Sequence, residues 1–140
     1  MTDRLQTLMD QAYARWEAAP MSKVDFLDTL NADERFAVHT VNLTCQVRNG
    51  GFMQWRDNGY GTPETVSYLQ RTLRRMGTPA ATEVRKLLDQ YESFTEACED
   101  SQRMDEDDWN ELSAALDPLD TAFYEVDDAF LAECESWLVG

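Results

Sequence analysis

Apolar residues recur three or four positions apart along most of the chain, which is the spacing of one face of an α-helix. Leu5, Leu8, Ala12 and Trp16 follow this spacing and predict a first helix. After a break at Pro20, a short second helix is expected to end near residue 30. No window alternates apolar and polar residues for long enough to predict a β-strand.

Capping signals mark the boundaries of the central helices. Asn31–Glu34 has the form of a capping box, and it opens a helix that is predicted to stop at residues 49–51. Thr62-Pro63 and Thr78-Pro79 each place an N-cap residue before a proline in the first helical position. Gly77 is expected to end the first of these two helices, and the second should run to about residue 97.

The last third of the chain continues the helical pattern. Residues 109–116 predict one helix, Asp117-Pro118 is expected to start another, and Asp127-Asp128 is expected to cap the last. The fold class is therefore all-α, as a single compact domain of about six or seven helices. Within residues 1–140 we expect N-terminal helices to residue 30, a central part from 31 to 77, and an acidic helical part from 78 onward.

Size and composition favour one ordered domain. A chain of 140 residues with 43% hydrophobic residues can bury its own core. No apolar run is long enough to cross a membrane and no targeting segment is evident, so we expect a cytoplasmic protein with no membrane contact. Cys45, Cys98 and Cys134 are far apart in sequence, as expected of free thiols in a reducing compartment.

The net charge of −15 is distributed very unevenly. Residues 1–80 contain nine acidic and nine basic side chains, whereas residues 81–140 contain eighteen acidic and three basic ones. Acidity that serves only solubility would be expected to spread over the whole chain. Seven aromatic residues lie in the same acidic part, which argues against a disordered tail and for a folded, charged surface.

The acidic side chains of this part are predicted to line helix surfaces. One group shares a face of the helix after Pro79, apart from the apolar face that is predicted to include Tyr91 and Phe94: Asp89, Glu92, Glu96, Glu99 and Asp100. A second group lies in the following connection and the next helix: Asp105, Glu106, Asp107, Asp108 and Glu111. Helix neighbours three or four residues apart are about 5 to 6 Å apart at Cβ, comparable to successive phosphates in a nucleic acid. These ten residues form the candidate partner-binding surface.

A structural explanation competes for several of these acids. Asp105–Asp108 precede or open a helix, where negative charge favours the positive end of the helix dipole. Asp117, Asp127 and Asp128 have the positions of N-caps. A solvated face with no partner is therefore the alternative interpretation of the acidic part.

Candidate enzyme and metal sites are missing from the sequence. His39 is the single histidine, so no paired-histidine metal motif is possible, and its place within a helix favours a structural role. Residues 100–111 approach the length of a calcium loop, but Met104 and Asp105 stand where a ligand and a glycine are needed. We therefore expect no catalytic residues, no metal and no cofactor.

The segment CQVRNGGFMQWRDNGYG, residues 45–61, contains the most distinctive motif. The motif residues are Asn49, Gly50, Gly51, Phe52, Gln54 and Trp55. On physical grounds this is a helix end whose glycines accept left-handed geometry, while Phe52 and Trp55 pack the returning chain onto the core. The interpretation is structural, and a ligand pocket at the motif is the alternative.

The motif also carries a family resemblance. With Glu34-Arg35 before it, the helix end at Leu73–Gly77 after it, and Leu116–Asp120 and Phe123-Tyr124 late in the chain, it resembles a family of small acidic all-α bacterial proteins that contains a DNA-mimic protein. The resemblance implies an all-α fold and, for at least one member, protein carboxylates that occupy the DNA-binding surface of a regulator. Gln46 and residues 58–61 depart from the usual pattern of the family.

These observations lead to one main hypothesis and two alternatives. The main hypothesis is a non-enzymatic DNA mimic whose acidic surface, with Trp109 as a possible anchor, occupies the DNA-binding groove of a basic protein such as a transcription regulator or a defence nuclease. One alternative is a small-molecule-binding or enzymatic domain with a pocket near Asn49 to Trp55. The other is a helical adaptor or dimer. Direct nucleic-acid binding is not expected, and the chain is expected to be a monomer or homodimer.

Overall fold

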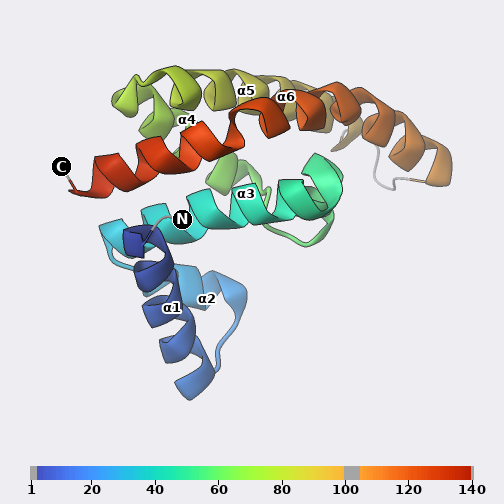
Figure 1. Ribbon diagram of the computed structural model, residues 1–140. Helices are drawn as coiled ribbons and strands as arrows, with labels where there is room; N and C mark the ends of the chain where they lie inside the picture. The colour runs from blue at the N-terminus through green and yellow to red at the C-terminus, as the bar shows by residue number, and fades with distance from the viewer. Residues whose placement is uncertain (1–2, 100–104, 140) are drawn as a thin grey trace.

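The N-terminal helices lie on one side of the long third helix. The computed structural model describes residues 3–99 and 105–139, and the regular elements in these ranges are all helices (Figure 1). α1 (Asp3–Ala18) buries Leu5, Leu8 and Ala12, as the spacing predicted, and α2 (Lys23–Asp28) follows it. Both lie below α3 (Ala32–Asp57) in Figure 1, while α5 (Pro79–Glu99) and α6 (Glu106–Val139) lie above it.

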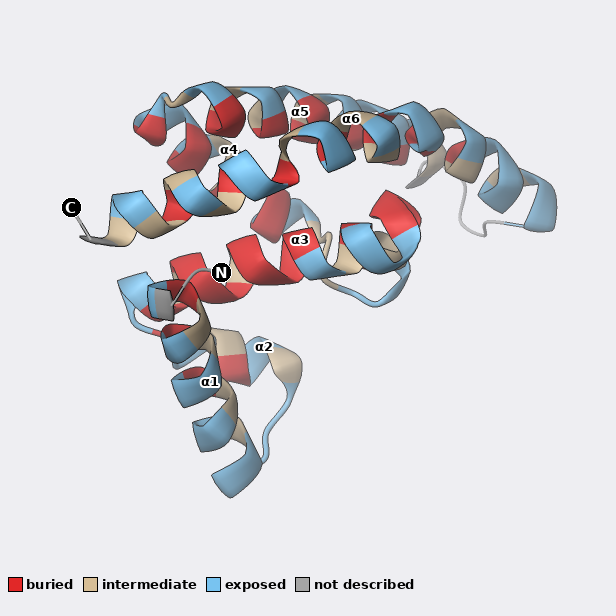
Figure 2. Ribbon diagram, in the orientation of Figure 1, coloured by how far each residue is buried: buried red, intermediate tan, exposed pale blue. Residues whose placement is uncertain are grey.

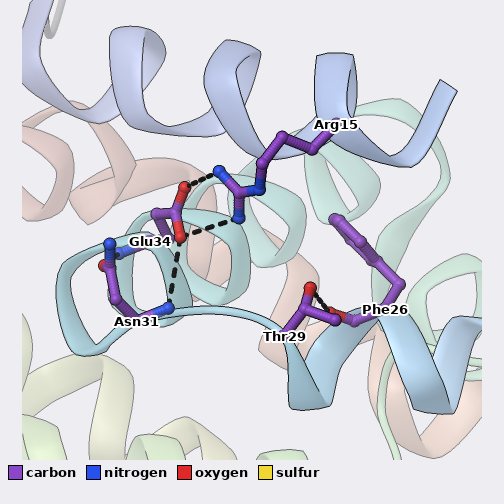
Figure 3. A network of polar contacts seen from close by, with 5 residues as sticks. All are labelled: Arg15, Phe26, Thr29, Asn31 and Glu34. Carbon is purple, nitrogen blue, oxygen red and sulfur yellow. Dashed lines mark hydrogen bonds and ion pairs between the residues drawn. The ribbon is translucent and has the colours of Figure 1, made fainter. Parts of the chain in front are cut away.

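The start of α3 is held by the predicted capping box and by a partner from α1 (Figure 3). The Asn31 side chain accepts a hydrogen bond from the Glu34 amide at 2.8 Å, and the Glu34 carboxylate accepts one from the Asn31 amide at 3.1 Å. Arg15 of α1 donates hydrogen bonds from its two terminal guanidinium nitrogens, Nη1 and Nη2, to the same carboxylate. This bidentate pairing holds the pKa of Glu34 below its usual value, although Glu34 is only 3% exposed.

α4 (Pro63–Met76) and α5 (Pro79–Glu99) begin and end close to the predicted positions. The Thr62 hydroxyl accepts a hydrogen bond from the Thr65 amide at 3.3 Å and caps α4. Gly77 takes a left-handed conformation with φ of 63° and donates its amide to the Leu73 carbonyl at 3.1 Å, which ends α4 as predicted.

The buried face of α5 differs from the prediction at one position. Phe94 is 38% exposed, whereas its neighbour Thr95 is buried. Thr95 continues the spacing of Leu88 and Tyr91, and its hydroxyl donates to the Tyr91 carbonyl at 2.9 Å, so burial leaves no polar group unpaired. The prediction that Phe94 lies on the buried face was therefore wrong.

α6 (Glu106–Val139) is one continuous helix, and the predicted breaks within it are wrong. Pro118 lies inside α6 instead of starting a new segment, and Asp127-Asp128 cap no helix. Leu116, Leu119 and Phe123 are buried at helical spacing across the expected break. Packing of this continuous apolar face against α3 and α5 outweighs the local cost of an internal proline, about 3 kcal/mol.

The core lies between α3 and the layer of α5 and α6, where the buried residues of Figure 2 face one another. Its centre is an aromatic cluster in which Phe52 lies 5.7 Å from Tyr91 and 5.9 Å from Phe123, between ring centroids. A smaller apolar cluster joins α1, α2 and α3 around Phe26 and Val38. The chain thus forms a single all-α domain, as predicted. None of the helices in the described ranges is long and apolar enough to cross a membrane.

Candidate protein-binding surface

The predicted acidic face of α5 is only partly free of contacts. Asp89 accepts hydrogen bonds from Arg85 at 3.2 Å and from Gln70 of α4 at 3.0 Å, and Gln70 also lies 3.4 Å from Glu92. Glu96, one turn further on, is exposed. Glu99 belongs to the last turn of α5, and Asp100 lies outside the described residues.

The acids at the start of α6 combine a capping role with exposure. Asp105 is the N-cap residue, because its carboxylate accepts a hydrogen bond from the Asp108 amide at 2.8 Å. Glu106 and Asp107 are exposed in the first turn, where the helix dipole favours negative charge. Glu111 is exposed one turn after Asp107. Both proposed explanations for these acids, helix stabilisation and surface charge, are thus compatible with their positions.

Trp109 lies among these acids and links α6 to α3. Its indole nitrogen donates to the Asp57 carboxylate at 2.9 Å, while 41% of the residue remains exposed. Asp57 also pairs with Arg56 at 3.1 Å. The hydrogen bond fixes the orientation of the Trp109 ring, which is still accessible to solvent. A ring that is already held in place loses little conformational entropy on contact with a partner.

Further along α6, the carboxylates turn toward the rest of the fold. At Gly50 and Gly51 the α3 backbone leaves helical geometry, with a φ of 79° at Gly51, and helical turns then resume up to Asp57. The predicted helix end at residues 49–51 is thus a kink within α3. Asp120 accepts a hydrogen bond from the Phe52 amide at 2.8 Å, and Tyr124 donates its hydroxyl to the Val47 carbonyl at 3.0 Å.

The α6 side chains of Asp120 and Tyr124 bind the α3 backbone on either side of this kink. A kink leaves an amide donor on one side and a carbonyl acceptor on the other without their helical partners. Asp120 and Tyr124, one turn apart on α6, supply an acceptor to the Phe52 amide and a donor to the Val47 carbonyl, on the two sides of the kink. A Cβ atom on Gly51 would come within 2.3 Å of the Asp120 carboxylate, so the close approach itself requires glycine.

The remaining motif residues are engaged within the fold. Phe52 and Trp55 are 0% exposed, and Asn49 is exposed. Gln54 donates its side-chain amide to the Gln46 side chain at 3.0 Å. These contacts account for the motif as the connection between two helical segments.

Two further contacts join α6 to the beginnings of other helices. Glu133 accepts hydrogen bonds from the Ala80 and Ala81 amides, both at 2.9 Å, at the start of α5. Glu135 accepts from the Arg4 and Leu5 amides at the start of α1. These amides lack partners within their own helices, so a carboxylate there satisfies them and complements the helix dipole. Thr78 stands in the predicted N-cap position, where its carbonyl accepts a hydrogen bond from the Thr82 amide at 2.9 Å, but the side chain that binds the Ala80 and Ala81 amides is that of Glu133.

An ion pair completes the contact of α6 with α3. Arg48 donates to Asp127 and to Asp128, each at 2.8 Å. Asp127 is only 9% exposed, and the residue that was predicted to cap a helix is therefore a partner of Arg48. We call Asp120, Asp127, Glu133 and Glu135 the inner carboxylates, because each one bonds to another helix.

Sequence reasoning missed the roles of the inner carboxylates. They were counted as part of the acidic excess or taken as caps of their own helix, because a helical wheel shows which residues share a face but not which helix that face contacts. Asp120 and Tyr124 stood in the resemblance pattern, which was the one available signal. We call Glu96, Glu106, Asp107 and Glu111 the outer carboxylates, because they are exposed and take no part in these bonds between helices.

The basic residues of α4 and α5 lie toward the other end of the molecule. Arg74 and Arg75 end α4, and Arg85 and Lys86 follow in the first half of α5. The 21 residues of α5 span about 30 Å, so these cations are well separated from the outer carboxylates near its far end. The separation exceeds the Debye length of about 8 Å at physiological salt, so these four cations offset the charge of the acidic end only weakly. Arg56 lies closer to that end and is paired with Asp57.

Fold and surface together define a small all-α protein with an acidic surface at the end where α5 leads into α6. Within the described parts of the chain, no group of three or more His, Cys, Asp or Glu side chains is placed to hold a metal ion. Residues 28–140 match the model of the DMP19-like protein family, named for DNA mimic protein 19, and the chain belongs to that family. No curated protein and no solved structure matches the chain.

Proposed function

We propose that this protein is a non-enzymatic DNA mimic, which occupies the DNA-binding surface of a basic protein and so blocks DNA binding. The observation that carries the proposal is the set of outer carboxylates, which are exposed and take no part in the hydrogen bonds and ion pairs between helices described above. Membership of the DMP19-like family supports the same role. The proposed partner is a transcription regulator or a defence nuclease in the cytoplasm.

The spacing of the outer carboxylates suits a groove that binds phosphates. Asp107 and Glu111 are four residues apart on α6, which places them about 5 to 6 Å apart at Cβ. Like charges at this spacing cost a few tenths of a kcal/mol per pair. A basic partner would turn that repulsion into attraction and would associate quickly through electrostatic steering.

The proposed surface extends beyond the outer carboxylates. Asp105 and Asp108 lie beside them at the start of α6, and Asp89 and Glu92 lie along α5 with part of their charge already engaged. We include Glu99 and Asp100 in the proposed surface because they follow Glu96 within the same acidic stretch of the sequence. Trp109 would supply the apolar contact, since its accessible ring is held in place by Asp57.

The test is affinity capture from a lysate of the encoding cell, first at low salt, with elution by duplex DNA and separately by high salt. We expect a basic DNA-binding protein to elute under both conditions, and purification of it then allows a direct affinity measurement. Replacing the four outer carboxylates with their amides should weaken that affinity by tenfold or more, about 1.4 kcal/mol. Retention that ignores the DNA competitor would contradict a mimic.

A matched control separates a specific surface from general acidity. Four acids are exposed on the N-terminal half: Asp10, Glu17, Asp25 and Asp33. Replacing all four with their amides changes the net charge from −15 to −11, as the outer variant does. The control variant should keep its affinity. Equal loss in both variants would favour the adaptor interpretation, in which the acids act only as diffuse charge.

The alternative of a ligand pocket at the motif finds no support in its geometry. Phe52 and Trp55 have no exposed surface, and Gln54 is bonded to Gln46. The non-enzymatic part of the proposal rests on the family, whose DNA-mimic members act by binding.

A further inference from the structure

A cavity of about 410 Å³ lies between α2, α3 and the start of α4, apart from the acidic surface. Its volume is within the range of small-molecule sites, about 300 to 1,000 Å³. In Figure 1, α2 lies on the side of α3 that faces away from α5 and α6. None of the outer carboxylates lines this cavity.

Aromatic and apolar side chains form much of the cavity wall. The rings of Tyr60 and Tyr68 line it, and the His39 ring lies 5.1 Å from the Tyr68 ring. The Lys23 ammonium lies 4.0 Å from the centre of the Tyr60 ring and donates to the Asn58 carbonyl at 2.9 Å, which fixes that part of the wall. Val24, which also lines the cavity, is 70% exposed and adds an apolar rim.

Arg35 brings positive charge to this wall. Its guanidinium donates one hydrogen bond to the Leu27 carbonyl of α2 at 3.3 Å, which uses one of its five donors. Burial and the charge of Arg35 lower the pKa of His39 to about 4, so the imidazole is neutral at pH 7. Burial raises the pKa of Tyr68, while Arg35 and Arg75 act to lower it. Lys23 and Arg35 are the two cationic side chains of the cavity lining, which also contains the carboxylates of Asp28 and Glu64.

The negative groups of the cavity lie at exposed positions. Asp28 and Glu64 belong to its lining and are both exposed. With a net charge of −15 on the whole chain, they disfavour a ligand with several negative charges. A single negative charge paired with Arg35, on an apolar body, fits the lining best.

We propose that this cavity binds a small organic monocarboxylate, with the carboxylate on Arg35 and the apolar body against Tyr60 and Tyr68. The guanidinium offers paired donors of the geometry that a carboxylate accepts. Neutral His39 is placed beside the same space and can form a hydrogen bond without repelling or neutralising the ligand.

The single histidine makes the test direct, because the ring resonances of His39 are the only histidine signals in the protein's own sequence. At pH 7, the protein would be titrated with benzoate, phenylacetate, indole-3-acetate and isovalerate while its NMR spectrum is recorded. We expect at least one of the four to shift the His39 ring signals saturably. Phenylacetamide, the neutral analogue of phenylacetate, should bind at least tenfold more weakly than the best acid. The absence of saturable shifts with all four acids would overturn the proposal.

Two arginine variants then test whether the ligand's carboxylate binds to Arg35. Arg35→Met should weaken binding of the best acid by tenfold or more, whereas Arg74→Met, which removes the same charge from the exposed end of α4, should leave it unchanged. Equal binding of acid and amide by the unaltered protein would also overturn the proposal, and that comparison does not depend on the folding of a variant. The variant with all four outer carboxylates replaced should bind the small-molecule acid with unchanged affinity. A failure of this proposal can therefore be distinguished from a failure of the DNA-mimic proposal.

Discussion

The two ends of α6 use the same chemical group for different purposes. At the first end, Glu106, Asp107 and Glu111 project into solvent without bonding to another helix. Along the remainder, the inner carboxylates hold the kink of α3, the Arg48 guanidinium and the starts of α5 and α1. A charge count treats both groups alike, yet only the first group is available to a partner.

The difference shows how an acidic protein can be both charged and stable. Asp120, Glu133 and Glu135 accept hydrogen bonds from backbone amides, and Asp127 accepts one from the Arg48 guanidinium, so each of these charges has a contact within the fold. At Asp120 the bond only partly offsets burial, which raises the pKa of this carboxyl. The outer carboxylates repel one another, and among them Glu106 and Asp107 are favoured by the helix dipole at the start of α6. The proposed binding to a basic partner would turn this repulsion into attraction.

The largest expected effect comes from forcing Asp120 away from the kink. Gly51→Ala places a Cβ within 2.3 Å of the Asp120 carboxylate at a φ of 79°, and we expect a loss of about 3 kcal/mol or more in unfolding free energy, combining strain with loss of the Phe52 bond. Chemical denaturation measures it.

Gly59→Ala is the matched control for that substitution. Gly59 has a φ of 81°, but its nearest contact would be the flexible Lys23 ammonium at 3.3 Å. The loss there should be about 1 kcal/mol. Equal losses at the two glycines would show that Asp120 contributes nothing at the kink.

The next largest effect on the unfolding free energy is expected on lowering the pH. A variant at His39 separates the contribution of the histidine from that of the carboxylates. The pKa of His39 is about 4 in the folded protein against a usual 6.5, so stability is full above pH 6.5 and falls as pH drops toward 4, by up to about 3 kcal/mol. His39→Gln should remove this slope in denaturation series at several pH values.

Any fall that remains below pH 4.5 in His39→Gln should come from carboxylates. The pKa values of Glu34 and Glu133 are lowered by their bonds, so their contributions are present above pH 4.5 and are lost as pH falls further. A variant that keeps the full slope between pH 6.5 and 4 would contradict the assignment to His39.

Glu133→Gln tests an inner carboxylate directly. The amide retains one acceptor for the two bonds to Ala80 and Ala81 and loses the charge that favours the start of α5. We expect a loss of about 1 to 2 kcal/mol in unfolding free energy. Hydrogen exchange should show the increased opening at the first turn of α5, and unchanged protection there would count against the contact.

The smallest effect on stability is expected at the outer carboxylates. Glu111→Gln and Glu96→Gln should each change the unfolding free energy by about 0.5 kcal/mol or less, because both side chains are exposed. The order should be reversed for partner affinity. The two outer substitutions should weaken binding of the partner, whereas Glu133→Gln should leave it unchanged. Thermal denaturation and the affinity assay on the same samples test both parts.

Local signals in the chain were sufficient for the boundaries that depend on neighbouring residues. The capping box at Asn31, the hydroxyl cap at Thr62 and the left-handed Gly77 were all predicted, because each acts within a few residues of its own position. Pro118 and the Asp127-Asp128 pair were misread for the same reason. Their local preference for a helix start was outweighed by distant packing of α6, which neighbouring residues do not reveal.

By itself, the sequence determined the all-α class, most helix boundaries, the family and the one-sided placement of charge, since periodicity, caps and composition are local properties. Only the tertiary structure decided which carboxylates are available. Asp120 meets Phe52 across 68 positions and Glu135 meets Leu5 across 130. Such contacts depend on how helices pack in space, and packing is set by the whole core rather than by any single segment.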